Sequence, residues 1–257
     1  MSGVPPSAKK IEIESLSVSY GQRRALEDVT LDVREHEILG IIGPANAGKT
    51  TLLNCVNRMT DVIPGCRVTG TVRIDGIDVR KIGDVNALRR RIGMVFPLPV
   101  GLPLTIYDNV AFAPRMAGVR DRATLDETVE RCLRQSALFD EVKDRMNDLG
   151  TRLSGGQQQR LTIARALSMS PEILCLDEFS IAVDPVTTMR IEEVLKELRR
   201  NMTIILVTNL VQQAKRLADR TALFLGGRLI EVDENAVIFS RRTADARTFS
   251  YVQGLFG

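Results

Sequence analysis

A glycine-rich segment directly after a short apolar run is the feature that most restricts how this chain can fold. Ile38–Ile42 has the length of one buried strand, and the residues that follow fit the pattern G-x-x-x-x-G-K-T. Glycines in this spacing let successive backbone N–H groups turn toward one anion, and the start of the next helix adds its positive dipole end. The pattern therefore predicts a phosphate-binding loop between a strand and a helix of an α/β domain.

Within this loop, Lys49 is placed to reach the terminal phosphates of a nucleotide, and the hydroxyl of Thr50 is placed to ligate Mg²⁺. A turn that matches the pattern by chance is the alternative, and the strand before it and the helical pattern after it argue against that alternative. The candidate nucleotide-binding residues are Gly43, Pro44, Ala45, Asn46, Ala47, Gly48, Lys49, Thr50 and Thr51.

An acidic pair ends a second apolar run, Ile173-Leu-Cys-Leu-Asp177-Glu178. Ligands of open α/β sheets bind at the carboxyl ends of the strands. Asp177 is therefore a candidate to hold Mg²⁺ through water, and Glu178 is a candidate base for the attacking water. A strand end that is merely solvated is the alternative.

A second glycine-rich helix start occurs at Leu153-Ser-Gly-Gly-Gln-Gln-Gln-Arg160. Its candidate anion-binding residues are Ser154, Gly155, Gly156 and Gln157, because a helix N-terminus with a serine hydroxyl beside it suits a phosphate. As an isolated string the segment would be an ordinary N-capped helix.

The apolar patterns predict three regions. The first third is β-rich, with a bulge near Glu14-Ser15, a hairpin at Asp75-Gly76 and one helix from about 50 to 59. A mostly helical subdomain spans about 97–154, where Leu125, Val129, Leu133 and Ala137 have helical spacing and 140–146 continues as helix. Helices at 157–169, 185–200 and 210–218 then alternate with strands at 173–176 and 203–208, before a hairpin around Gly226-Gly227. This order predicts a parallel sheet in one domain over 11–257, after a flexible tail of 1–10.

Composition excludes several classes of protein. The net charge of +3 comes from 35 basic and 32 acidic residues that are mixed along the chain, which argues against nucleic acid as a partner. The 4 cysteines show no metal-like spacing and suggest a reducing environment. No apolar run approaches the ~20 residues of a membrane-spanning helix, so a membrane role is expected to be peripheral, through a partner.

These motifs together resemble the ATP-binding cassette subunits of ABC transporters, over about 11–257. The connecting segments resemble more closely the ATPase subunits of bacterial phosphate-specific importers, and those segments are 57–65, 88–96, 106–110 and 251–257. The resemblance implies ATP and Mg²⁺ as cofactors, a head-to-tail homodimer, and permease subunits that carry inorganic phosphate. It also implies a peripheral location on the cytoplasmic face of the membrane.

The resemblance implies further residue roles. Tyr20 would stack on adenine, with a strand-end core aromatic as the alternative. Ser154, Gly155 and Gly156 would contact the γ-phosphate held by the opposite subunit. Asp184 would cross the dimer interface, and it would also serve as a helix N-cap before Pro185.

Two positions depart from the family pattern. Pro97 stands where the family has a glutamine that contacts Mg²⁺, and Asn209 stands where it has a histidine that grips the γ-phosphate. Asn209 is expected to donate one hydrogen bond to a phosphate oxygen, but it does not titrate near neutral pH. His36, the only histidine, is expected on the surface. Hydrolysis is therefore expected to be slow, and a regulatory cassette with little or no turnover is the alternative function.

Overall fold

The computed structural model describes residues 8–181 and 183–255. The chain divides into two compact units, one made of Met1–Arg89 with Asn201–Gly257 and the other of Arg90–Arg200. Most of the predicted tail, residues 1–7, and the last two residues of the segment 251–257 lie outside the described residues. Strand β1 begins at Lys9, so the tail prediction was wrong for its last two residues. The reason is that Lys10 is buried and donates to Asp75 Oδ1 at 2.9 Å.

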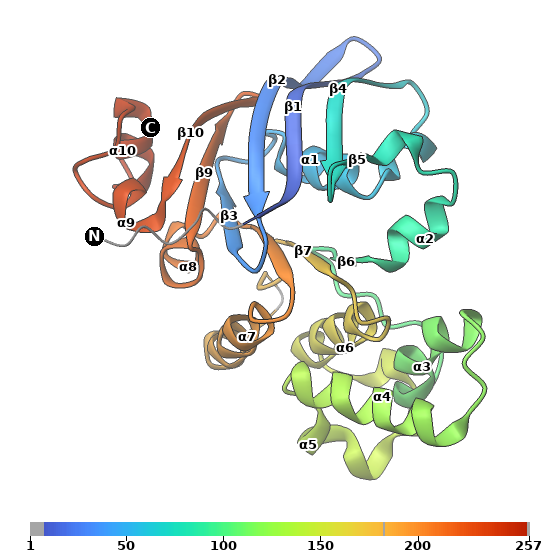
Figure 1. The fold of residues 1–257 in the computed structure, drawn as a ribbon. Helices are drawn as coiled ribbons and strands as arrows, with labels where there is room; N and C mark the ends of the chain where they lie inside the picture. The colour runs from blue at the N-terminus through green and yellow to red at the C-terminus, as the bar shows by residue number, and fades with distance from the viewer. Residues whose placement is uncertain (1–7, 182, 256–257) are drawn as a thin grey trace. The chain divides into compact units, whose positions relative to one another are not determined.

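The first unit contains a four-stranded antiparallel sheet with the order β2-β1-β4-β5 (Figure 1). Its strands are β1 (Lys9–Tyr20), β2 (Arg23–Arg34), β4 (Cys66–Ile74) and β5 (Ile77–Asp78). The predicted bulge is confirmed, because the pairing of β1 with β4 shifts register between Glu14 and Ser17, and Ser15 has a φ of 46°. The predicted hairpin is confirmed as β4 and β5.

A second sheet of this unit carries the phosphate loop. Strand β3 (Ile38–Ile42) pairs in parallel with β8 (Thr203–Val207) and with β9 (Arg220–Leu225), and β10 (Arg228–Glu234) pairs antiparallel with β9. Parallel strands end at the same edge of a sheet. The segments that follow Ile42 and Val207 are therefore neighbours.

The helices of the first unit are mostly short. They are α1 (Lys49–Val56), α2 (Val85–Arg90, which ends in the second unit), α8 (Val211–Leu217), α9 (Asn235–Ile238) and α10 (Ala246–Val252), with 3-10 turns at Met59–Val62 and Val79–Lys81. Helix α8 packs on β3, and an apolar cluster joins β3, α8, β9, α9 and α10 through Ile42, Ala214, Leu223, Ile238 and Val252. Helix α1 ends at Val56, three residues earlier than predicted.

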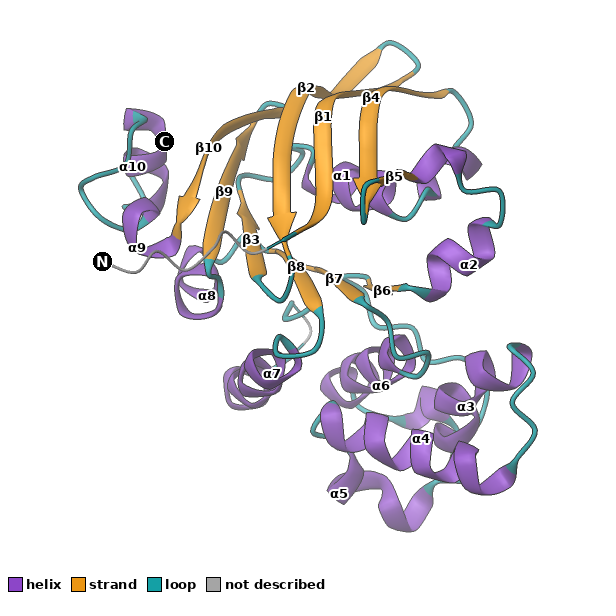
Figure 2. Ribbon diagram, viewed as in Figure 1, coloured by secondary structure: helices purple, strands orange, loops and turns teal. Residues whose placement is uncertain are grey.

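The second unit combines two parallel strands with most of the longer helices (Figure 2). Strand β6 (Ile92–Val95) pairs with β7 (Ile173–Asp177). The helices are α3 (Ile106–Met116), α4 (Arg122–Gln135), α5 (Phe139–Val142), α6 (Gly155–Leu167) and α7 (Pro185–Leu198), with 3-10 turns at Lys143–Arg145 and Gly150–Arg152. Helices α3, α4 and α6 contact one another. Among the described residues, no helix is both long and apolar enough to cross a bilayer.

The helical pattern predicted for this unit is confirmed only in part. Leu125, Val129 and Leu133 are buried on α4 as predicted. Ala137 lies beyond the end of α4 with a φ of 54°, so its place in the pattern was wrong. The predicted continuation over 140–146 is only the single turn of α5 followed by a 3-10 turn. Helix α6 starts at Gly155 rather than at Gln157, because Ser154 caps it.

Candidate active site

The phosphate loop connects β3 to α1, and its glycines cannot be replaced without conflict. Gly48 is the N-cap of α1 with a φ of 96°, and a Cβ there would lie 2.5 Å from Leu26 Cδ2 and 2.6 Å from the carbonyl oxygen of Ala25. A Cβ on Gly43 would lie 2.1 Å from the carbonyl oxygen of Phe224. Both positions therefore require glycine for the path of the backbone.

The ammonium of Lys49 is held against this loop. Lys49 is only 5% exposed, and its Nζ donates to the carbonyl oxygens of Gly43 at 2.8 Å and Pro44 at 2.9 Å. A third bond of 2.7 Å runs from Nζ to Oδ1 of Asn209. Negatively charged oxygens form stronger hydrogen bonds to an ammonium than these neutral acceptors do. The loop therefore contains a positioned cation that a phosphate group can attract.

Asn209 makes a contact that the sequence did not predict, because its Oδ1 accepts from Nζ of Lys49. The expected bond from its amide to a phosphate oxygen stays a prediction. Asn209 reaches the loop because it follows β8, the parallel neighbour of β3. The buried Thr208 fixes this turn, since its Oγ1 accepts from the backbone N–H of Leu210 at 3.0 Å and donates to Oε1 of Gln213 at 2.8 Å. Asn209 thus orients the lysine in this state, and its N–H₂ group is a separate donor.

Tyr20 is at the end of β1 and is half-buried. Its hydroxyl donates to Oγ1 of Thr51, in the first turn of α1, at 3.5 Å. Burial raises the pKa of Tyr20 above its ordinary value, so the phenol stays neutral and remains a donor. Thr51 therefore holds the hydroxyl end of the Tyr20 side chain. The neighbouring residue Thr50 is exposed to solvent.

The residues present suit a magnesium nucleotide. The N-cap of α1, Gly48, has no side chain, and no side-chain cap bond occupies this helix start. In the first unit, the exposed hydroxyl of Thr50 is a hard oxygen donor of the kind that Mg²⁺ prefers. In the second unit, the carboxylate of Asp177, which is 2% exposed at the end of β7, is a donor of the same kind. Mg²⁺ in nucleotide sites is typically held by one or two protein groups plus phosphates and water. No cluster of three or more His, Cys, Asp or Glu ligands occurs in the described part of the chain.

In the second unit, the parallel strands β6 and β7 bring two predicted features to one edge. Val95 pairs with Leu176, so the segment containing Pro97 and the acidic pair Asp177–Glu178 follow neighbouring strand ends. Glu178 is half-buried and has a φ of 47°, an unusual backbone conformation for glutamate. This conformation follows directly after the last residue of β7.

Gln159 is a further residue at this edge that no sequence motif singled out. This residue of α6 is fully buried, and its Nε2 donates to the carbonyl oxygen of Phe96, directly before Pro97, at 3.3 Å. Its Oε1 has no hydrogen-bond partner. A glutamine of α6 thus contacts the backbone next to Pro97, the position at which the family has a glutamine. In the sequence, the run of three glutamines at 157–159 is the one feature that could have drawn attention to Gln159.

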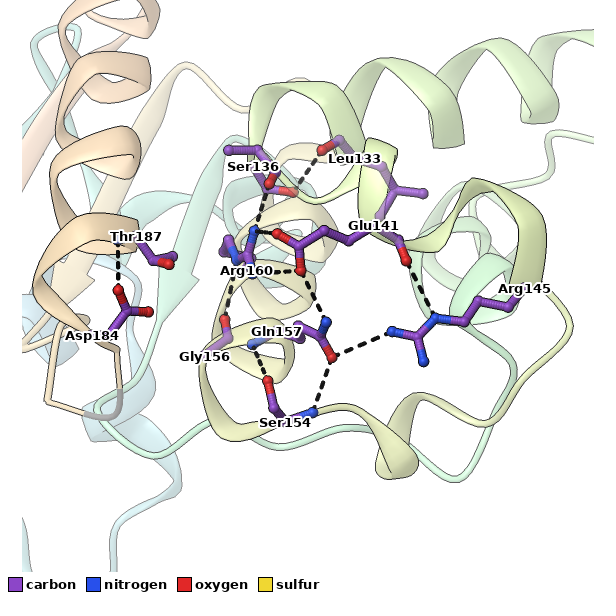
Figure 3. A network of polar contacts seen from close by, with 11 residues as sticks. Leu133, Ser136, Glu141, Arg145, Ser154, Gly156, Gln157, Arg160, Asp184 and Thr187 are labelled. Carbon is purple, nitrogen blue, oxygen red and sulfur yellow. Dashed lines mark hydrogen bonds and ion pairs between the residues drawn. The ribbon is translucent and has the colours of Figure 1, made fainter.

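The helix start at Ser154 forms a capping box (Figure 3). The Oγ of Ser154 accepts from the N–H of Gln157 at 3.4 Å, and Oε1 of Gln157 accepts from the N–H of Ser154 at 3.1 Å.

Asp184 is the N-cap of α7, and its carboxylate accepts from the N–H of Thr187 at 2.9 Å. Its hydrogen bonds with Thr187 hold the pKa of Asp184 below its usual value. The N-cap prediction for Asp184 is confirmed, and so is the surface position of His36.

Comparison with known proteins identifies the family. The family model described as ABC transporter matches residues 26–180. The chain belongs to the ABC transporter family. It is similar to the cassette MJ0796 bound to ADP and Pi, with 28% identity, a TM-score of 0.77, and coverage of 88% of this chain and 98% of that one. The predicted fold class, an ABC-type P-loop NTPase, is confirmed.

Two further solved structures share the fold. The cbiO1 protein from Clostridium perfringens, part of the transporter complex cbiONQ, has 23% identity, a TM-score of 0.79 and 92% coverage of both chains. A bacterial Atm1-family ABC exporter with ATP bound has 24% identity, a TM-score of 0.81, and coverage of 97% of this chain and 44% of that one. The family consists of ATP-binding cassettes that dimerise and work with membrane components, and ABC ATPase domains generally hydrolyse ATP with Mg²⁺.

Proposed function

We propose that this chain is the ATP-binding subunit of an importer. In this proposal it binds and hydrolyses MgATP as a head-to-tail homodimer, on the cytoplasmic face of the membrane, and drives inorganic phosphate uptake through permease subunits. The observation that carries the proposal is the buried ammonium of Lys49. It is held by the carbonyl groups of a loop whose backbone requires glycine at positions 43 and 48.

Each residue has one role in this proposal. Lys49 and the amides of 43–51 bind the phosphates, and Tyr20 stacks on the adenine. Thr50 and Asp177 hold Mg²⁺, which supplies charge neutralisation at the phosphates when it is bound. Glu178 accepts a proton from water. Across the dimer, Ser154, Gly155 and Gly156 donate to the phosphate of the opposite subunit, and Asp184 contributes to the interface.

Phosphate as the cargo is supported by the connecting segments 57–65, 88–96, 106–110 and 251–257. The first test is uptake of radiolabelled phosphate by cells of the source organism from which the gene for this chain has been deleted. Uptake at limiting phosphate should fall by at least ~10-fold, and the wild-type gene should restore it. The Lys49→Ala gene should not restore it, because the variant lacks the cation that binds the phosphates of ATP in the loop, and without bound ATP no hydrolysis drives transport. Unchanged uptake in the deletion strain would exclude phosphate as the cargo.

The second test separates a slow ATPase from the regulatory alternative. Asn209→His together with Pro97→Gln restores the two groups that the family carries at these positions. Losing one preorganised donor to a transition state typically costs ~10²–10³ in rate, so the double variant should release phosphate at least ~10-fold faster than the parent. Its MgATP affinity should change much less, because Lys49 and the loop amides remain. Equal rates of phosphate release would show that Pro97 and Asn209 do not limit hydrolysis.

A further inference from the structure

We infer that Glu141 is a positioning residue for ATP-dependent dimerisation, acting through the turn Ser154–Gln157. This inference rests on the proposed function, because that turn is proposed to bind the phosphate of the opposite subunit. Glu141 belongs to the single-turn helix α5, and neither the strand order nor any motif singles it out.

Glu141 links two residues of α6 (Figure 3). Its Oε1 accepts from Nη1 of Arg160 at 2.7 Å, and its Oε2 accepts from Nη2 of Arg160 at 3.1 Å. Oε2 also accepts from Nε2 of Gln157 at 2.9 Å. One carboxylate therefore holds both the guanidinium and the side-chain amide.

Arg160 is the more deeply buried partner of this ion pair. Its side chain is 5% exposed, and Nη1 also donates to the carbonyl oxygen of Ala137 at 2.6 Å. A two-point contact with a buried guanidinium restricts the carboxylate to one orientation. The hydrogen bond from Arg160 is the main cause that lowers the pKa of Glu141 below its usual value, so the carboxylate is charged at neutral pH.

Gln157 is fully engaged within this network. Its Nε2 donates to Glu141, and its Oε1 accepts from the N–H of Ser154 at 3.1 Å and from Nη2 of Arg145 at 3.5 Å. Gln157 is thus the reciprocal cap of α6, and its predicted role as a nucleotide ligand stays a prediction. Without Glu141, Nε2 of Gln157 loses this acceptor, and the amide is held through Oε1 alone, by the N–H of Ser154 and by Arg145.

The cap decides which donors of the turn remain for a phosphate. The Oγ of Ser154 accepts from the N–H of Gln157, so its hydroxyl proton points elsewhere and is available as a donor. The N–H of Ser154 is used by Gln157, while the N–H groups of Gly155 and Gly156 stand in the first turn of α6, where a helix binds anions. Glu141 thus stabilises the set of donors that the opposite nucleotide would meet.

The test uses ATP-dependent dimerisation of full-length protein in a Glu178→Gln background, followed by light scattering over a range of protein concentrations. Glu141→Ala should raise the dimer dissociation constant at least ~10-fold, the order expected for a lost charge-assisted hydrogen bond. MgATP affinity of the monomer should stay within ~2-fold. Asp140→Ala removes the adjacent exposed carboxylate and is the matched control, which should dimerise as the parent does.

A second variant leaves the Glu141–Arg160 ion pair in place. Gln157→Glu sets a carboxylate against Glu141, and it should weaken dimerisation to a similar degree. Adding Glu141→Ala to Gln157→Ala should weaken dimerisation little further, because Glu141 acts through Gln157, whereas independent structural losses would add. Dimerisation equal to the parent in both single variants would overturn the inference. If the parent itself gains no dimer with ATP, the proposed function fails, and this inference falls with it.

Discussion

Replacing Lys49 with alanine should lower the affinity for MgATP by at least ~100-fold. The ammonium is the cation that the structure holds inside the phosphate loop, where it donates to two carbonyl groups and to Asn209. A phosphate would replace these neutral partners with charged ones, and two charge-assisted hydrogen bonds at ~1.5–3 kcal/mol each correspond to a loss of this size.

Isothermal titration calorimetry with MgATP measures this change. Lys81→Ala is the matched control, because Lys81 is an exposed lysine of the same unit, at the end of the 3-10 turn Val79–Lys81. That variant should bind MgATP as the parent does. An affinity of Lys49→Ala within a few-fold of the parent, in a protein with the parent's circular dichroism, would exclude the loop as the nucleotide site.

Much of the fold was predictable because its central strands are short, apolar and followed by recognisable loops. The sequence pattern of Ile38–Ile42 and that of 173–177 each matched a buried strand, and the order of elements predicted parallel pairing. The short helices α2, α9 and α10 were missed, since stretches of four to seven residues carry too few turns for a periodic pattern. Ala137 shows the converse error, because helical spacing alone gives no sign of a left-handed residue after a helix end.

The site was predictable where one segment carries the chemistry, and not where side chains from distant segments meet. The loop 43–50 is a contiguous motif, so its position followed directly from the sequence. The bond from Lys49 to Asn209 joins residues 160 positions apart, and only the pairing of β3 with β8 explains it. Similarly, Glu141 is 16 residues before Gln157, and no sequence spacing predicts that the single-turn helix α5 contacts the start of α6. The capping box itself could have been predicted, since Ser154 and Gln157 have the S-x-x-Q spacing.

Replacing Glu178 with glutamine should reduce ATP hydrolysis by ~10²–10⁴, the usual contribution of a general base. Glutamine keeps the size and hydrogen-bonding capacity of the side chain but cannot accept a proton at neutral pH. The affinity for MgATP should change little, because the binding groups of 43–51 are untouched. Glu193→Gln on α7 is the matched control, as it removes an exposed carboxylate of the same unit, and it should leave hydrolysis unchanged.

Steady-state phosphate release from MgATP, measured side by side for the parent and for Glu178→Gln, tests most directly the claim that this chain is a working ATPase despite Pro97 and Asn209. We predict measurable turnover by the parent and a loss of at least ~100-fold in the variant, with nucleotide affinity retained in both. Phosphate release that is absent from the parent, or equal in the two proteins, would contradict it and would favour a regulatory cassette that binds ATP without hydrolysing it.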